Sequence, residues 1–311
     1  MRIVLMGQAA FGEKVLERLI ERKEEVVGVY CPPDVPVGKK DAVKERALSA
    51  QIPVFQPTSM RDPEVIKEYK TLEPDLNIMA FVTDIIPGEI LHYPTHGSIQ
   101  YHPSLLPKHR GKSAINWAVI QGEKKTGISI FWVDEGIDTG PILLQKEVEI
   151  APDDTTGSLY FHKLFPLGVD ALMEALDMIN AGTAPKIAQD DSQATYEPPC
   201  DEQHAQIDWS RPLQEVYNLI RGCDPQPGAY TFFGRKKLQI YATRALVGGK
   251  SAKTAQPGEV CEITHEGMLV AGNGGALLIQ KVRPEGGGKI APADLAQTSN
   301  LAKGDRLQST S

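Results

Sequence analysis

The stretch that decides the fold is "LNIMAFV", residues Leu76–Val82. It is almost continuously apolar, which is typical of a β-strand covered on both faces, as strands are in parallel sheets layered with helices. Similar runs occur at Arg2–Met6 and Glu25–Tyr30, and amphipathic helical patterns occur at Phe11–Arg22 and Pro63–Leu72. Strands that alternate with helices predict a parallel α/β sheet for the first half of the chain.

The pattern changes after a polar, proline-containing segment at residues 184–205, which we expect to be a linker. One predicted helix, Leu213–Gly222, is followed by short β-like runs separated by glycine-rich turns such as "AGNGGA" and "PEGGGK". This pattern is typical of a small β-barrel. We therefore predict an α/β domain over residues 1–183 and a β-barrel-like domain over residues 206–311.

The amino-acid composition limits which classes of protein this chain can belong to. Hydrophobic residues make up 41% and charged residues 23% of the 311 residues, as in a globular protein. The start, Met1–Gly7, lacks the basic region and cleavage site of a signal peptide, and no apolar stretch reaches the length of a membrane span. The four cysteines include no CxxC pair, which argues against a disulfide framework or a zinc site. We expect a soluble cytoplasmic protein without membrane contact.

The net charge of −7 is unevenly distributed, because the residues from Gln206 onward carry a small basic excess. A mildly positive second half could contact a polyanion such as RNA. So small an excess is more often an ordinary solvated surface. Charge alone therefore does not predict a nucleic-acid partner.

The first predicted strand-to-helix turn is "GQAAFG", Gly7–Gly12. A dinucleotide-binding fingerprint would need glycine where Ala9 stands, and a phosphate-binding P-loop would need Lys-Ser or Lys-Thr after Gly12. We interpret the segment as a tight turn and expect no nicotinamide cofactor.

Histidines cluster at His92, His96, His102 and His109. Pro94 lies between the first two, so they do not form the helical i,i+4 pair of a zinc protease, and no glutamate stands between them. We therefore expect no metal site.

Two motifs carry the candidate chemistry. "SIQYHPSLLPKHRG", Ser98–Gly111, places His102 at the end of a predicted strand, and "VDEGIDTGPILLQ", Val133–Gln145, places Asp138 in a loop after the predicted strand Gly127–Val133. Ligands of open α/β sheets bind at the carboxyl ends of the strands. If the two strands are neighbours, His102 and Asp138 can converge on one crevice.

Together these motifs resemble the folate-dependent formyltransferases, a family that includes methionyl-tRNA formyltransferase and the hydrolase domain of 10-formyltetrahydrofolate dehydrogenase. The resemblance covers essentially the whole chain and implies a Rossmann-like catalytic domain followed by a smaller, OB-like β-barrel. "SAINWAVIQGEKKTGISIFWVDEG" and "IRGCDPQPGAY" look more like the hydrolase domain, whereas "CPPDVPVGKKDAVKERA" resembles a shortened form of the loop that tRNA formyltransferases insert into the acceptor arm.

The resemblance implies an enzyme that removes the formyl group from 10-formyltetrahydrofolate, without metal or nicotinamide. The acceptor stays open between methionyl-tRNA, a sugar or metabolite amine, and water. A non-catalytic folate- or RNA-binding protein is the alternative from another class, and a nicotinamide-dependent reductase is disfavoured by Ala9. Oligomeric state is left open.

The resemblance also implies roles for three residues. His102 and the residue at position 100 would hold the formyl oxygen, and Asp138 would accept a proton or orient His102. The family's transferases carry Asn-x-His there, whereas this chain has Gln100-Tyr101-His102. The dehydrogenase-type hydrolases have an apolar residue at that position. Glutamine supplies the same amide as asparagine on a longer arm, so Gln100 matches neither group.

We expect the folate to lie across the sheet edge and the loop after His102 to support the imidazole. The expected folate contacts are Phe81, Val82, Thr83, Ile85, Asp134, Glu135 and Gly136. The expected loop supports are Ser104, Leu105, Leu106, Pro107 and Gly111.

Overall fold

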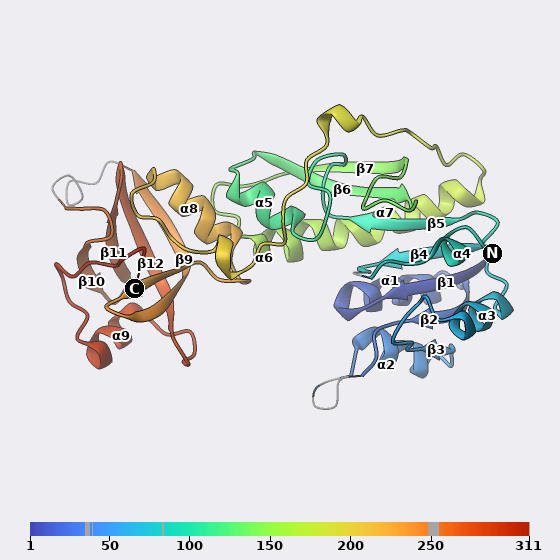
Figure 1. Ribbon diagram of the computed structural model, residues 1–311, viewed down its shortest axis with the longest axis horizontal. Helices are drawn as coiled ribbons and strands as arrows, with labels where there is room; N and C mark the ends of the chain where they lie inside the picture. The colour runs from blue at the N-terminus through green and yellow to red at the C-terminus, as the bar shows by residue number, and fades with distance from the viewer. Residues whose placement is uncertain (35–37, 39, 83, 248–254, 311) are drawn as a thin grey trace. The chain divides into compact units, whose positions relative to one another are not determined.

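The computed structural model describes residues 1–34, 38, 40–82, 84–247 and 255–310 (Figure 1). They form two compact units, which are described separately. Unit 1 comprises Met1–Lys112, Thr126–Val148 and Phe161–Glu197, and unit 2 comprises Ser113–Lys125, Glu149–Tyr160 and Pro198–Ser311. The predicted domain boundaries stay a prediction.

Unit 1 is built on a sheet whose described strands follow the order β3-β2-β1-β4-β5-β6-β7. The strands are β1 Arg2–Gly7, β2 Glu25–Tyr30, β3 Val54–Phe55, β4 Leu76–Ala80, β5 Ser98–His102, β6 Lys125–Trp132 and β7 Ile142–Glu149. The pairs from β3 to β5 are parallel, but β6 runs antiparallel to β5. The α/β prediction is therefore confirmed, whereas the prediction of a wholly parallel sheet is wrong at β6.

The apolar stretch that predicted the fold forms β4. Every residue of this strand is buried, as expected for a strand covered on both faces. Its one polar member, Asn77, accepts a hydrogen bond from the Tyr69 hydroxyl (2.9 Å) and donates one to Ser98 Oγ (3.0 Å). The Asn77 amide is therefore hydrogen-bonded in the core, which avoids the free-energy cost of a buried polar group without a partner.

Helices cover both faces of this sheet. They are α1 Ala9–Glu21, α2 Ala42–Ser49, α3 Pro63–Thr71, α4 Gly88–Leu91 and α7 Phe165–Asn180. On one face α1 and α7 pack side by side (Figure 1). The rings of Phe11 and Phe165 meet edge to face there, with 5.4 Å between their centroids. The opposite face receives Tyr69 of α3, through its contact with Asn77.

The turn between β1 and α1 is closed by a carboxylate. The amide of Ala9 donates to both carboxylate oxygens of Asp41 (3.0 and 2.9 Å), and Asp41 also caps α2 through the amide of Val43. A phosphate at the start of α1 would therefore meet a negative charge instead of a free amide, which agrees with our interpretation of "GQAAFG" as a structural turn.

Unit 2 contains α5 Ala114–Ile120, α6 Thr156–Leu159, α8 Leu213–Gly222 and α9 Pro292–Ser299. Its strands are β8 Tyr230–Phe233, β9 Lys236–Val247, β10 Val260–Thr264, β11 Gly267–Gly272 and β12 Gly275–Pro284. They pair antiparallel in the order β10-β11-β12-β9-β8, around a core that includes Trp209, Val216 and Leu277. The predicted β-rich second half is confirmed as an antiparallel sheet, and its closure into an OB-like barrel stays a prediction.

The helical stretch after β7 is divided. A π-helix, Tyr160–Leu164, separates α6 from α7, and Pro166 lies in the first turn of α7, where its missing amide hydrogen costs nothing. Among the helices of the described residues, none is long and apolar enough to cross a membrane.

Candidate functional site

Strand β5 presents alternate side chains to opposite faces of the sheet. Gln100 and His102 share one face, because side chains two residues apart in a strand point the same way. Tyr101 points to the other face, where its ring lies 4.3 Å from that of Phe11. A β-carbon at Gly168 of α7 would collide with the Tyr101 ring, so glycine is required there. Packing on the far face therefore fixes the strand that carries Gln100 and His102.

The imidazole of His102 is buried, with 5% of the residue exposed, and both of its nitrogens have neighbours. Nε2 lies 2.8 Å from the backbone oxygen of His109, and Nδ1 lies 3.4 Å from Oδ2 of Asp138. A carbonyl oxygen only accepts, so Nε2 carries hydrogen and donates it. Nδ1 is then the nitrogen that faces the Asp138 carboxylate.

Asp138 is buried and held in a strained conformation. Its φ of 55° lies in the left-handed region, which costs a non-glycine residue about 1 kcal/mol or more. Oδ2 accepts a hydrogen bond from the amide of Gly111 (2.8 Å), while Oδ1 has no hydrogen-bond partner among the described residues. One carboxylate oxygen is therefore anchored, and the other is free of hydrogen bonds to the described residues.

The route by which Asp138 reaches His102 differs from our expectation. Because β5 and β6 are antiparallel, His102 lies opposite Ser129, and Trp132 at the end of β6 lies opposite Ile99. The two strands do not end at the same edge of the sheet, so convergence at neighbouring strand ends was the wrong reason for the pairing. The loop after β6 instead returns and carries Asp138 back to His102.

The loop after His102 is tied down by Ser129. The Ser129 hydroxyl donates to the backbone oxygen of Ser104 (2.7 Å) and accepts from the amide of Leu106 (3.1 Å). The Ser104 hydroxyl closes the loop by donating to the oxygen of Lys108 (2.6 Å). These bonds hold the backbone that leads to the His109 oxygen, the acceptor for His102.

Side-chain packing supports the same loop. Leu106 is buried in a cluster with Phe131 and Ile142, and Leu105 packs against Gly127, where a β-carbon would lie 2.6 Å from it. The oxygen of Pro107 accepts from the amide of Thr195 (3.3 Å). Gly111 adopts a φ of +99°, which favours glycine, at the point where its amide reaches Asp138.

The expected folate contacts fall into two groups, and Thr83 lies outside the described residues. The first group follows β4, whose Met79 is opposite Gln100, so Phe81 continues toward the strand end that carries His102. Phe81 and Val82 line a cavity of about 50 Å³ together with Tyr30 of β2. Phe81 and Ile85 are 45% and 65% exposed, which makes them apolar surfaces open to a ligand.

The second group is the turn after β6. Oδ1 of Asp134 accepts from the amide of Gly136 (3.1 Å) and from the Thr139 hydroxyl (2.6 Å), so this carboxylate shapes the turn. Oε1 of Glu135 lies 2.7 Å from Nε2 of His92, and this hydrogen bond lowers the pKa of the exposed Glu135 carboxyl. His92 therefore pairs with a carboxylate at the rim of the site.

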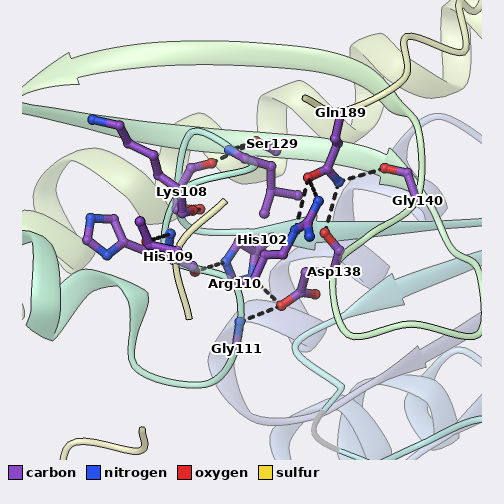
Figure 2. A network of polar contacts seen from close by, with 12 residues as sticks. His102, Lys108, His109, Arg110, Gly111, Ser129, Asp138, Gly140 and Gln189 are labelled. Atoms are coloured by element: carbon purple, nitrogen blue, oxygen red, sulfur yellow. Dashed lines mark hydrogen bonds and ion pairs between the residues drawn. The ribbon is translucent and has the colours of Figure 1, made fainter. Parts of the chain in front are cut away.

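Sequence reasoning missed the residues that hold the two loops together. Arg110 is buried, and its guanidinium donates to Oε1 of Gln189, to Asp191 (2.7 Å) and to the Tyr196 hydroxyl (2.6 Å). Burial alone would lower the pKa of Arg110, but the bonds to Asp191 and Tyr196 raise it overall, so the group stays charged. Gln189 also donates to the backbone oxygens of Asp138 and Gly140 (Figure 2).

These partners come from the segment expected to be a linker. Its backbone pairs with the site at two places, Ile187 with Ile142 and Tyr196 with Arg110. The segment "APKIAQDDSQATYEPP" has no hydrophobic periodicity, so no signal in the sequence could have assigned it to the site.

Comparison with known proteins agrees with this architecture. Residues 1–176 match the family described as formyl transferase, and residues 200–300 match the formyl transferase C-terminal domain. The chain is 38% identical over 312 residues to the methionyl-tRNA formyltransferase of Geobacter sulfurreducens. The aligned region covers 99% of this chain and 96% of that protein.

A second group of relatives is longer. The chain is 41% identical over 304 residues to the cytosolic 10-formyltetrahydrofolate dehydrogenase of Xenopus tropicalis. The aligned region covers 94% of this chain but 34% of that protein. The chain thus spans about a third of the length of this group of relatives.

Among solved structures, HypX from Aquifex aeolicus in complex with tetrahydrofolic acid has the same fold. It superposes with a TM-score of 0.70 at 20% identity over 99% of this chain and 50% of that chain. The family match and the level of identity confirm the resemblance seen in the motifs: this chain belongs to the formyl transferase family.

Proposed function

We propose that the protein is a folate-dependent enzyme that removes the formyl group from 10-formyltetrahydrofolate and passes it to an acceptor. The observation that carries this proposal is the buried contact between His102 and Asp138, with His102 on the strand face that also bears Gln100, in a member of the formyl transferase family. Relatives named as tRNA formyltransferases and as formyltetrahydrofolate dehydrogenases support the same donor.

The proposed reaction needs a proton acceptor for the attacking amine or water. We assign this role to Oδ1 of Asp138, because Oδ2 is already bonded to the amide of Gly111. A positioned acid–base group contributes roughly 10²–10⁴ in rate. When the bond from the formyl carbon to the folate nitrogen breaks, the same carboxyl can return the proton to that nitrogen.

The proposed reaction also needs donors for the negative oxygen that develops on the formyl carbon. His102 donates from Nε2 to His109, so Nδ1 is the ring nitrogen that we assign to the formyl oxygen, to which it donates when the imidazole carries both hydrogens. The side-chain amide of Gln100 has no hydrogen-bond partner among the described residues, and we assign it the second donor role. Each donor of this kind is worth about 10²–10³ in rate.

We place the folate rings against the exposed apolar side chains of Phe81 and Ile85 and against the turn Asp134–Gly136. The exposure of these two side chains supports the placement, since a flat aromatic ligand would remove them from water. Val82 belongs to the same proposed lining.

For the acceptor, we propose an amine, with methionyl-tRNA first, because the match to the methionyl-tRNA formyltransferase extends along nearly the whole of both chains. Water is the second candidate, favoured by the level of identity to the dehydrogenases. We further infer that the unit 2 sheet closes as an OB-like barrel and that the protein works in the cytosol, as the name of one relative suggests.

The test is incubation of the purified protein with 10-formyltetrahydrofolate, with and without charged initiator tRNA or sugar amines, and measurement of released tetrahydrofolate. Release that depends on tRNA identifies the transferase, and release without any added acceptor identifies the hydrolase. The proposal fails if no condition releases tetrahydrofolate, or if His102→Ala releases it as fast as the unaltered protein.

A further inference from the structure

We propose that Gln189 is a positioning residue that fixes the backbone of Asp138 and couples it to the loop bearing the acceptor for His102. The inference rests on the proposed function only for the effect of Gln189 on the reaction rate. The effect of Gln189 on the position of Asp138 can be tested without catalysis. Gln189 lies outside both motifs that predicted the site.

The side-chain amide of Gln189 uses its full hydrogen-bonding capacity (Figure 2). Nε2 donates to the backbone oxygens of Asp138 (2.8 Å) and Gly140 (2.7 Å). Oε1 accepts from Nη2 (2.8 Å) and Nε (3.2 Å) of Arg110. A rotated amide would face the guanidinium with N–H groups and the carbonyls with an oxygen, so only one orientation is stable.

Asp138 needs such support because its backbone is left-handed. The two carbonyls that Gln189 holds belong to Asp138 itself and to the residue two positions later, and they span the strained turn. Without these donors the turn can relax toward the common backbone regions. Relaxation would move the carboxylate away from the amide of Gly111 and from Nδ1 of His102.

Arg110 links this support to the other catalytic side chain. It directly follows His109, whose backbone oxygen accepts from Nε2 of His102. A single glutamine therefore joins the loop that holds Asp138 to the loop that orients His102. A misplacement of about 1 Å between reacting groups can cost about 10² in rate.

The segment that carries Gln189 has other attachments, so a change at this side chain should leave it in place. The backbones of Ile187 and Ile142 exchange two hydrogen bonds (2.7 and 2.9 Å). The amide of Arg110 donates to the oxygen of Thr195 (3.0 Å), and the guanidinium keeps its bonds to Asp191 and Tyr196.

The experiment compares two variants at this position with a control on the same segment. Gln189→Met keeps the length and removes all four hydrogen bonds, whereas Gln189→Glu keeps the acceptors for Arg110 and loses the donors to the two carbonyls. The control is Gln193→Met, an exposed glutamine whose side-chain amide donates to the Ser192 hydroxyl (3.4 Å) and has no other hydrogen bond to the described residues. Melting temperatures establish that all three are folded.

We expect both Gln189 variants to lower kcat by about 10- to 100-fold and to leave KM for 10-formyltetrahydrofolate within about twofold, because Asp138 is displaced and the folate contacts are not. Gln193→Met should match the unaltered protein. An unchanged kcat in Gln189→Glu overturns the role of the two donors, and a change confined to KM would mean that Gln189 acts on substrate binding.

A second measurement separates this inference from the proposed function. Amide hydrogen exchange at Gly111, which donates to Asp138, should speed up about 10-fold or more in both Gln189 variants and stay unchanged in Gln193→Met. If the unaltered protein releases no tetrahydrofolate but this exchange responds, the enzymatic proposal fails and the positioning inference holds. Unchanged exchange in both variants overturns the inference whatever the activity.

Discussion

The imidazole of His102 lies 3.4 Å from the carboxylate of Asp138, although the strands that precede the two residues run in opposite directions. The contact depends on a returning loop whose turn is left-handed at Asp138 and whose carbonyls are held from a distant segment. The chemistry of the pair is therefore local, and its geometry is built by residues far away in the chain.

Asp138→Asn should lower kcat by about 10²–10⁴, because an amide cannot take a proton from the attacking group. The variant should stay folded, since the side-chain oxygen can still accept from the amide of Gly111. Tetrahydrofolate release measures the rate. Asp170→Asn, which alters an exposed ion pair with Arg18, is the control and should retain full activity. Equal rates in the two variants would remove Asp138 from the mechanism.

Gln100→Leu should lower kcat by about 10²–10³, because it removes one of the two donors assigned to the formyl oxygen. Gln100→Asn keeps the amide on a shorter arm and should retain activity within about 10-fold. Both rates are measured with the acceptor that the unaltered protein uses. The donor role is contradicted if leucine and asparagine give the same rate.

The strand pattern could be predicted wherever burial leaves a clear signal. Leu76–Val82 predicted β4, with an end two residues late, because both faces of that strand are buried. β7, Ile142–Glu149, was missed. Its first half lies inside the motif Val133–Gln145, which was interpreted for its chemistry, and its second half alternates between half-buried and exposed residues. The direction of β6 could not be predicted, because alternation of side chains is the same in either direction.

Some residues of the candidate site could be predicted from the sequence and others could not. His102, Asp138 and Gln100 could be singled out because they lie in two motifs that resemble a family. Gln189 lies outside both motifs, and Arg110 lies in the first motif without a role that the motif indicates. Their roles come from contacts between segments roughly 50 to 80 residues apart that leave no periodic pattern. Tertiary contacts between polar side chains are therefore the part of the site that could not be predicted from this one sequence.

Gly168→Ala should lower the free energy of unfolding by about 1–3 kcal/mol, because the added methyl group collides with the Tyr101 ring in a packed interior. Tyr101 stands between Gln100 and His102, so activity should fall as well. Denaturant unfolding measures the first effect and tetrahydrofolate release the second. Gly88→Ala meets only ordinary contacts at 3.5 Å and beyond, so its stability should be unchanged.

Stability should fall at alkaline pH because of Cys31, which directly follows β2. Burial, aided by the nearby Asp41 carboxylate, raises the pKa of this thiol from 9.0 to about 11. Between pH 9 and about pH 11, the thiol is therefore protonated in the folded protein and ionised in the unfolded chain. Its contribution to stability is therefore fully present below pH 9 and is lost as the pH rises through about 11.

The full loss is expected to be about 3 kcal/mol, since the pKa differs by about two units and each unit corresponds to about 1.4 kcal/mol. Denaturant unfolding at pH 8 and pH 11 measures it, with Cys31→Ala as the comparison. The variant has no thiol to ionise, so its stability should fall less between the two pH values than that of the unaltered protein. Parallel pH profiles for the two proteins would mean that Cys31 ionises alike in the folded and unfolded states.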